Sequence, residues 1–364
     1  MRIGLVYSTG FPPEEGIGTY VWKLANNLRK RGHTPVLITR GNGKSSIKNG
    51  IEIHQAKFYP VYPFHVHVHE FFVQNVVDKL DLDVLHIHSP LSPVVDADVP
   101  ILATIHTPIM PVASITDKTT VSGLLGYLQS VTVSQRIERD LVNSADMVTA
   151  VSESIAEALE LQYSENTRLL YNGVDADEYD ECTEQGEDKY LLFVGRIAQS
   201  KGILQLIRAY SEYNIDLPVR VVGSGPLEGK MKQFVSKKDI SDKVIIKGYV
   251  SDGDLKEMYA NAEALILPSL YEGLPTVVLE ALASGTPVIG TEVPGIQDLI
   301  NHRVNGLLMP DNSIEQIHAS ITKLSENPEL KSLLSSNARQ SVVPKYTWDS
   351  ISNDAIKYYN TLTQ

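Results

Sequence analysis

Short apolar runs alternate with longer stretches of helical periodicity along the whole chain. The apolar runs are rich in Val, Ile and Leu, and each ends in a loop of Gly, Pro, Ser or charged residues. Such runs are typical of parallel strands whose two faces are both covered by helices. The pattern therefore predicts an α/β fold with two doubly wound parallel sheets, one in each half of the chain. The predicted strands span residues 2–8, 34–40, 83–89, 101–106, 146–152, 190–196, 218–225, 243–249, 264–269 and 287–291.

An acidic segment divides the two groups of predicted strands. Residues 174–188 are poor in apolar side chains and show no periodicity, which indicates a solvated linker. We expect residues 1–173 to form one Rossmann-like domain and residues 189–345 another. Parallel sheets bind ligands at the carboxyl ends of their strands, so the polar and glycine-rich loops that follow the strands are the candidate sites.

Composition excludes several classes of protein. Of the 364 residues, 43% are hydrophobic and 21% are charged, as in soluble globular proteins. The net charge of −12 argues against broad nucleic-acid binding. Cys182 is the only cysteine, so no intramolecular disulfide is expected and a reducing, cytoplasmic location is favoured. No window stays apolar over the ~18 to 20 residues of a membrane span, and the N-terminus reads as a first strand.

Two glycines lie at the start of the first predicted helix. Gly16 and Gly18 stand where small residues let backbone N–H groups approach an anion, although a plain strand-to-helix turn would have the same pattern. A dinucleotide-binding fingerprint needs a third glycine three residues after Gly18, and Val21 occupies that position. The loop therefore disfavours a nicotinamide-dependent oxidoreductase.

Two cations follow the first strand of the second half. Arg196 ends that strand, and Lys201 lies five residues later at the start of the next predicted helix. Cations beside a helix N-terminus suit a diphosphate whose charge must be held while a bond breaks; solvated surface charges are the alternative. Gly223 ends the next strand in another open turn, which favours the anion site.

Glu272 and Glu280 lie in a segment that is otherwise almost free of charge. We predict a helix that begins at Pro275, with Glu272 in the loop before it and Glu280 inside it. The free N–H groups at the helix start would face an anion. Ionised carboxylates only accept hydrogen bonds, so sugar hydroxyls would be natural partners of both glutamates. Alternatively, the two glutamates could be the acid and the base of a glycosidase, but that function would not explain the nearby cations.

Six motifs follow one another along the chain. They are NGVD at 172–175, GRIAQSKG at 195–202, GSGPLEGKM at 223–231, KGYVS at 247–251, YEGLPTVVLEALASGTPVIGTEVPG at 271–295 and NGLL at 305–308. In this order they resemble the retaining nucleotide-sugar glycosyltransferases of family 4. The resemblance covers nearly the whole chain, and the ordered set is more specific than any single motif. It implies the GT-B architecture, in which two Rossmann-like domains face each other across a cleft and a last helix, here within residues 346–364, crosses back to the N-terminal domain.

The resemblance implies a role for each matching residue. Arg196 and Lys201 are expected to hold the donor diphosphate, Glu272 the donor sugar's hydroxyls and Glu280 the ribose. His106 is expected beside the outer hydroxyls of that sugar. The main chain at Tyr249 and Val250 is expected to read the base. The helix start at Leu274, Thr276 and Val277 is expected to bind sugar or phosphate through its backbone, and Gly16 is expected near the diphosphate and the acceptor. The anion-binding argument adds Gly18, Gly223 and Gly273 to the donor-binding set.

The implied reaction moves a hexose-type sugar from a UDP- or GDP-sugar to a hydroxyl with retained anomeric configuration. Arg196, Lys201 and a helix dipole would stabilise the departing diphosphate, so no metal or other cofactor is expected. In the family the acceptor proton is thought to pass to the leaving phosphate, and we assign no general base. The acidic triplet Asp96 to Asp98 lies in a predicted surface turn. The chain departs from the family at Glu15, where a second glycine is common.

The first half also carries candidate acceptor-binding features. Segment 58–72 holds six aromatic residues and histidines at 65, 67 and 69. An extended segment would put the three histidines on one face, as a metal needs, whereas a helix would align only His65 and His69. An acceptor wall and ordinary packing are further interpretations. The long connection 108–146, apolar at 121–133, would suit a lipid. We expect a glycan or lipid-linked acceptor, with peripheral contact at the inner membrane face.

Two other functions fit the same architecture. A sugar-nucleotide epimerase would need acid and base groups beside the sugar and would release an epimer without any acceptor. A non-catalytic nucleotide-sugar-binding protein would keep the motifs of the second domain and bind without turnover. No oligomeric state follows from the sequence.

Overall fold

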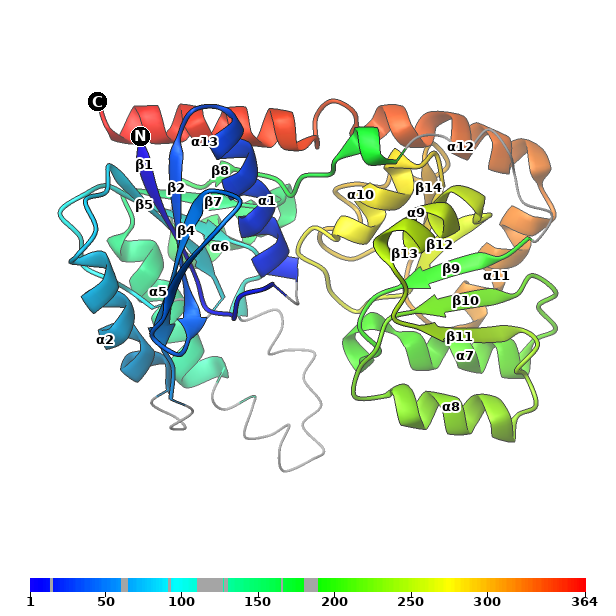
Figure 1. Ribbon diagram of the computed structural model, residues 1–364. Helices are drawn as coiled ribbons and strands as arrows, with labels where there is room; N and C mark the ends of the chain where they lie inside the picture. The colour runs from blue at the N-terminus through cyan, green and yellow to red at the C-terminus, as the bar shows by residue number, and fades with distance from the viewer. Residues whose placement is uncertain are drawn as a thin grey trace. The chain divides into compact units, whose positions relative to one another are not determined.

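The chain folds into two compact units (Figure 1). The first comprises Met1–Asn172 together with Trp348–Gln364, and the second comprises Gly173–Thr347. The computed structural model describes residues 1–13, 16–59, 65–90, 93–109, 127, 130–164, 166–179 and 189–364.

The first unit is built on an eight-stranded sheet with the order β3-β4-β2-β1-β5-β6-β7-β8. Its neighbouring strands are parallel except for the antiparallel pair of β3 and β4. The strands are β1 (Arg2–Tyr7), β2 (Thr34–Gly41), β3 (Ser45–Lys48), β4 (Ile51–Lys57), β5 (Val84–Ser89), β6 (Ile101–Ile105), β7 (Met147–Ala150) and β8 (Arg168–Leu169). The described helices of this unit are α1 (Gly16–Lys30), α2 (His65–Val77), α5 (Gln135–Ser144), α6 (Glu153–Tyr163) and α13 (Trp348–Leu362).

The last helix belongs to the core of the first unit. Leu24 and Leu28 of α1 and Ile351, Ala355 and Tyr359 of α13 are buried in one hydrophobic cluster with β-strand residues of this sheet. Their spacing of four residues puts them on one face of each helix, and packing removes this apolar face from water. Figure 1 shows α13, in red, beside the blue α1. The expected return of the final helix to the N-terminal half is confirmed.

The second unit is built on a six-stranded, wholly parallel sheet with the order β11-β10-β9-β12-β13-β14. Its strands are β9 (Leu191–Val194), β10 (Val219–Val222), β11 (Val244–Gly248), β12 (Ala264–Leu267), β13 (Val288–Thr291) and β14 (Gly306–Met309). Its helices within the described residues are α7 (Ile203–Glu212), α8 (Glu228–Lys237), α9 (Asp252–Asn261), α10 (Thr276–Ala283), α11 (Ile314–Ser325) and α12 (Pro328–Val342). The strands β9, β12 and β13 are buried throughout, as the uninterrupted apolar sequences of β9 and β12 predict.

Each sheet reverses its strand order at one place. In the first unit the chain winds outward from β1 through β2 and β4 on one side and from β5 through β6 and β7 on the other. In the second unit β9 is followed outward by β10 and β11 on one side, and β12 leads to β13 and β14 on the other. Ligands of open α/β sheets bind outside the carboxyl ends of the strands at such reversal points. The topology therefore favours two positions for ligand binding: the carboxyl ends of β1 and β5 in the first sheet, and those of β9 and β12 in the second.

All ten predicted strands are present, and the α/β prediction is confirmed. Strands β3, β4, β8 and β14 were not predicted. β3 is exposed and largely polar, and β8 has only two residues, so neither carries the apolar pattern on which the prediction rested.

The structure describes residues 174–179 of the predicted linker 174–188. Val174 and Ala176 are buried, and the N–H of Val174 donates to the carbonyl of Tyr346 across 2.8 Å. The expectation of a solvated segment is therefore wrong for these residues, because the backbone pairs with the end of the second unit. Residues 180–188, including Cys182, lie outside the described part.

Candidate active site

The loops at the carboxyl edge of the second sheet are joined to one another by backbone hydrogen bonds. The N–H of Ile197, after β9, donates to Ser224 O, after β10, across 2.9 Å. The N–H of Leu270, after β12, donates to Ser200 O across 2.8 Å. Because buried backbone groups must find partners, these bonds hold the loops in one arrangement.

Two glycines allow these loops to approach closely. Gly223 has φ +126°, and a Cβ atom there would lie 2.0 Å from Gly195 O. Gly202 has φ +66°, and a Cβ atom there would lie 1.8 Å from Pro268 O. Any other residue would combine a strained backbone with an overlap. Gly223 therefore lies at the carboxyl ends of the strands, as predicted, and in the structure it contacts the backbone of Gly195.

Lys201 and Glu272 form an ion pair across the β9/β12 reversal point. Lys201 ends a short 3₁₀ turn, and its Nζ lies 2.6 Å from Oε1 and 2.8 Å from Oε2 of Glu272. Ser269 Oγ donates to the same Oε1 across 2.7 Å. Glu272 is only 7% exposed, so removing the cation would leave a carboxylate largely out of water. The structure thus brings together two predicted residues that stand 71 positions apart in the sequence.

Arg196 lies in the same loop as Lys201, but its side chain is exposed. Within the described ranges, no ion pair or hydrogen bond of its guanidinium group occurs. Arginine presents several donors in a planar fork that matches phosphate oxygens. The guanidinium is therefore available to an anionic ligand at this edge.

Helix α10 begins beside Glu272. Pro275 occupies the N-cap position and supplies no side-chain hydrogen bond to the first turn. The first N–H groups of a helix have no partner inside it, so those of Thr276 and Val277 are offered outward at the positive end of the helix dipole. Gly273 and Leu274 precede this turn, as predicted. The helix starts one residue later than expected, because Pro275 has an extended backbone.

Glu280 lies inside α10 and accepts a hydrogen bond from Tyr259 of α9. The Tyr259 hydroxyl is 2.8 Å from Oε2 of Glu280. Burial and the negative charge of Glu280 raise the pKa of Tyr259 well above its usual value, so Tyr259 stays protonated and donates. Glu280 therefore has a hydrogen-bond donor within the protein, and its role with ribose stays a prediction.

The predicted base-reading residues follow the edge strand β11. Gly248 has φ +69° and turns the chain, after which Tyr249 is 86% exposed and Val250 is half-buried. A tyrosine ring so far out of the core is available for contact with a ligand ring.

His106 follows β6 in the first unit and is buried with two other aromatic side chains. Its Nε2 lies 3.2 Å from Nδ1 of His88, and its ring forms a T-shaped pair with the Tyr20 ring at a centroid distance of 4.7 Å. Burial lowers the pKa of His106 to about 3, so the ring is neutral at physiological pH. The hydroxyl of Tyr20 is buried and has no hydrogen-bond partner among the residues that the structure describes.

Gly16 and Gly18 begin helix α1 at the β1/β5 reversal point. No atom of the described residues lies within 4 Å of a Cβ atom built on Gly16. A Cβ atom on Gly18 would lie 2.9 Å from Cβ of Pro13, so Gly18 is needed for packing whatever it binds. Glu15, where the chain departs from the family pattern, lies outside the described residues.

The histidine-rich segment is helical from residue 65, so the extended interpretation with three histidines on one face is wrong. His69 is buried and its Nδ1 is 3.1 Å from Lys57 O, whereas His67 is exposed. No group of three or more His, Cys, Asp or Glu side chains in the described ranges is arranged to hold a metal ion. Tyr59 and Phe71 are exposed, at 47% and 65%. Residues 60–64 and most of the apolar stretch 121–133 lie outside the described part.

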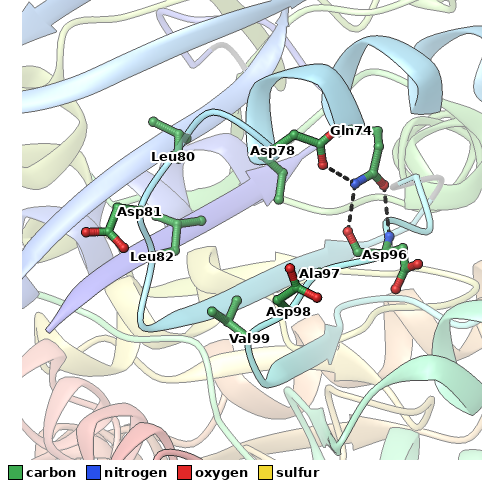
Figure 2. Close-up of a pocket in the computed structure, with 10 residues that line it drawn as sticks. Gln74, Asp78, Leu80, Asp81, Leu82, Asp96, Ala97, Asp98 and Val99 are labelled. Atoms are coloured by element: carbon green, nitrogen blue, oxygen red, sulfur yellow. Dashed lines mark hydrogen bonds between the residues drawn. The ribbon is translucent and has the colours of Figure 1, made fainter.

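A separate groove of the first unit lies at the amino ends of its strands, away from the carboxyl ends where the predicted site residues lie (Figure 2). It is lined by the segments that precede β5 and β6, including Leu82 and Val99. Gln74 bridges it by donating to Asp78 Oδ1 and to Asp96 O, each across 2.7 Å. The groove faces the amino ends of the strands and is acidic, so it does not suit a diphosphate. The Asp96–Asp98 triplet lies in this surface turn, as expected.

Sequence reasoning missed the residues that support the predicted ones. Ser269 bonds to Glu272, Tyr259 bonds to Glu280, and His88 bonds to His106. The sequence contained one usable signal, because His86 and His88 alternate within a buried strand and therefore share a face. The other partners come from strands and helices whose contact is decided by the fold.

Two family models match the chain. The model described as Glycosyltransferase Family 4 matches residues 15–178, and the model described as Glycosyl transferases group 1 matches residues 176–341.

Two of the named relatives match almost the whole chain, and a third matches part of it. An uncharacterized glycosyltransferase of Methanocaldococcus jannaschii is 26% identical over 99% of this chain and 98% of its own. N-acetyl-alpha-D-glucosaminyl L-malate synthase of Bacillus anthracis is 26% identical over 100% of this chain and 97% of its own. A Campylobacter jejuni N-acetylgalactosaminyltransferase, named for a diphospho-undecaprenol acceptor, is 25% identical over 60% of this chain and 61% of its own.

Solved structures share the fold. Sucrose-phosphate synthase of Thermosynechococcus elongatus aligns with a TM-score of 0.84 at 20% identity over 99% of this chain and 98% of its own. Anabaena HepE, solved with UDP and glucose, aligns with a TM-score of 0.75 at 16% identity over the whole of both chains. The described residues contain no helix with the length and apolar character of a membrane span.

Proposed function

Because the chain belongs to glycosyltransferase family 4 and has the GT-B fold, we propose that it moves a hexose-type sugar from a UDP- or GDP-sugar to a hydroxyl with retained configuration. The observation that carries the proposal is the Lys201–Glu272 ion pair at the β9/β12 reversal point. It puts a cation and a hydrogen-bond acceptor side by side, as a phosphorylated sugar requires.

The diphosphate would bind to positively charged side chains and to the positive end of a helix dipole. Arg196 supplies an exposed guanidinium, Lys201 an ammonium group, and the start of α10 supplies N–H groups at its positive end. An ammonium group has three hydrogens to donate, and Lys201 directs two of them at Glu272, so the third would be donated to a phosphate oxygen. Losing one such cation should lower turnover by about 10²- to 10³-fold, as for a removed oxyanion donor.

The two glutamates would bind hydroxyls at different ends of the donor. Glu272 keeps the hydrogen bond from Ser269, which orients the carboxylate toward the sugar that leaves. Glu280 keeps the hydrogen bond from Tyr259 and would accept from the ribose that stays. Both are held before the donor arrives, which lowers the entropy lost on binding.

The reaction itself would rest on electrostatic stabilisation of the leaving diphosphate. Arg196, Lys201 and the dipole of α10 supply the positive charge that a metal would otherwise bring, so we assign no metal to any step. The acceptor proton would pass to the leaving phosphate. His106 is neutral because burial lowers its pKa to about 3, so it would position the sugar by a hydrogen bond.

The acceptor would be a glycan or a lipid-linked sugar. The name of the Campylobacter jejuni relative includes a diphospho-undecaprenol acceptor. The exposed rings of Tyr59 and Phe71 offer an aromatic surface in the unit expected to bind the acceptor. With a lipid-linked acceptor the protein would work at the cytoplasmic face of a membrane.

The experiment is hydrolysis and transfer with UDP-glucose, UDP-N-acetylglucosamine and GDP-mannose. Arg196→Ala, Lys201→Ala and Glu272→Gln should each lose most of the activity. Lys232→Ala is the matched control, because Lys232 is an exposed cation on the same unit that pairs with Glu228. If wild type turns over none of the donors, or if the three variants match the control, the proposal is wrong. An epimer formed without acceptor would point to the epimerase alternative.

A further inference from the structure

A buried row of polar side chains crosses the first sheet behind His106. It begins at Tyr359 of α13, continues through His86 of β5 and Thr104 of β6, and ends at Thr149 of β7. All four side chains are fully buried. Polar groups that are buried away from water must form hydrogen bonds with one another, so the row can adopt only a few patterns of donors and acceptors.

The hydrogen bonds of this row run in one direction. The carbonyl of Ala103 can only accept, so Thr149 gives it its single hydroxyl hydrogen across 3.3 Å. Thr104 must then donate to Thr149, and Nε2 of His86 must donate to Thr104, each across 2.6 Å. A neutral imidazole has one hydrogen, so Nδ1 of His86 accepts from the Tyr359 hydroxyl across 2.7 Å.

The row is neutral at physiological pH. Burial, with a smaller effect of His106, lowers the pKa of His86 to about 3. Burial and the neighbouring histidines also hold the pKa of His88 well below its usual value. Each ring therefore carries one hydrogen and offers one donor and one acceptor.

His88 stands between this row and His106. Its ring lies 4.0 Å, centroid to centroid, from the ring of His86 and is tilted by 37° to it. The Tyr20 ring meets it edge-on at 5.5 Å. Nδ1 of His88 then bonds to Nε2 of His106 across 3.2 Å. Nδ1 of His106 receives no hydrogen bond from the described part of the chain.

We infer that His88 is a positioning residue, which holds Nε2 of His106 so that Nδ1 is the ring atom presented to the donor sugar. The inference rests on the proposed function, in which His106 lies beside that sugar. His86 keeps the His88 ring in place, and Tyr359 keeps His86 in place. The last helix of the chain thereby fixes a side chain at the carboxyl edge of the first sheet.

The first test needs no substrate. Nitrogen-15 NMR of the histidine rings is recorded for the full-length wild type, His88→Leu and His88→Asn. An Asn amide can place a donor or acceptor near the position of Nδ1, whereas Leu can offer neither. The Nε2 signal of His106 should move in His88→Leu and stay near its wild-type position in His88→Asn. An unchanged signal in His88→Leu would overturn the inference.

The second test is kinetic, with whichever of the three named donors is turned over. His88→Leu should lower kcat/KM by about 10- to 100-fold, the size of one lost buried hydrogen bond, and His88→Asn should recover most of it. If His106→Ala loses activity but His88→Leu does not, the inference is wrong and the proposed function stands. If His106→Ala is fully active, the proposed role of His106 is wrong, and the NMR result still decides which nitrogen His88 holds.

Discussion

The ammonium group of Lys201 lies within 2.8 Å of both carboxylate oxygens of Glu272. Lys201 follows β9 and Glu272 follows β12, so the ion pair joins the two loops at the point where the strand order of the second sheet reverses. A site with this ion pair is preorganised, because the acceptor for sugar and the donor for phosphate already fix each other's position.

The first prediction concerns the stability of this pair. Lys201→Met should lower the free energy of unfolding by about 1–3 kcal/mol, because it leaves a largely buried carboxylate without its cation. Adding Glu272→Gln should restore part of that loss, since the unpaired charge is then removed. Urea unfolding of both single variants and of the double variant measures the coupling. Additive losses would show that the two side chains do not interact in solution.

The second prediction separates the two glutamates. Glu272→Gln should lower kcat by about 10²-fold with little change in KM, because the sugar end is where the bond breaks. Glu280→Gln should raise KM by about tenfold with little change in kcat, because the ribose stays bound throughout. Steady-state kinetics with the active donor measures both. Equal effects on KM in the two variants would contradict this division of roles.

The third prediction concerns the glycine contact beneath Lys201. Gly202→Ala should lower the free energy of unfolding by more than about 2 kcal/mol, because φ is +66° and the new Cβ would overlap Pro268 O. Gly229→Ala in α8 is the control, since no atom in the described part of the chain lies within 4 Å of a Cβ there. The control should be neutral or stabilising by about 0.5–1 kcal/mol. Thermal and urea unfolding compare the two, and similar values would contradict the close approach.

The fourth prediction is acid sensitivity of the first unit. In the unfolded chain His86 and His106 bind protons below about pH 6.5, whereas burial excludes them from the folded protein down to about pH 3. The free energy of unfolding should therefore fall as pH drops from 6.5 toward 3, by about 1.4 kcal/mol per pH unit for each histidine. Above that window neither ring contributes to the pH dependence.

His106→Asn provides the comparison for this pH dependence. Its free energy of unfolding should fall less steeply below pH 6.5, by the contribution of one histidine, about 1.4 kcal/mol per pH unit. Urea unfolding at several pH values between 4 and 7 gives both slopes. Identical slopes for the two proteins would mean that His106 is not held neutral by burial.

Much of the architecture could be read from the sequence, because buried parallel strands require continuous apolar runs. Strand β12 and helix α10, for example, follow directly from ALIL and from the run after Pro275. Strand β3 could not be found in this way. Its SSIK sequence is exposed and pairs only because β4 lies beside it.

The sequence by itself determined the kinds of chemistry available. Cations at 196 and 201 and acids at 272 and 280 can be recognised from residue type, spacing and motif order alone. Their partners could not be recognised, because an ion pair between residues 71 positions apart depends on which strands become neighbours. Likewise, only the tertiary structure joined Tyr359 to His86, 273 residues away, since burial of α13 against the first sheet brings them together. Local sequence specifies strands and loops, whereas the strand order and the packing of helices decide which side chains share a site.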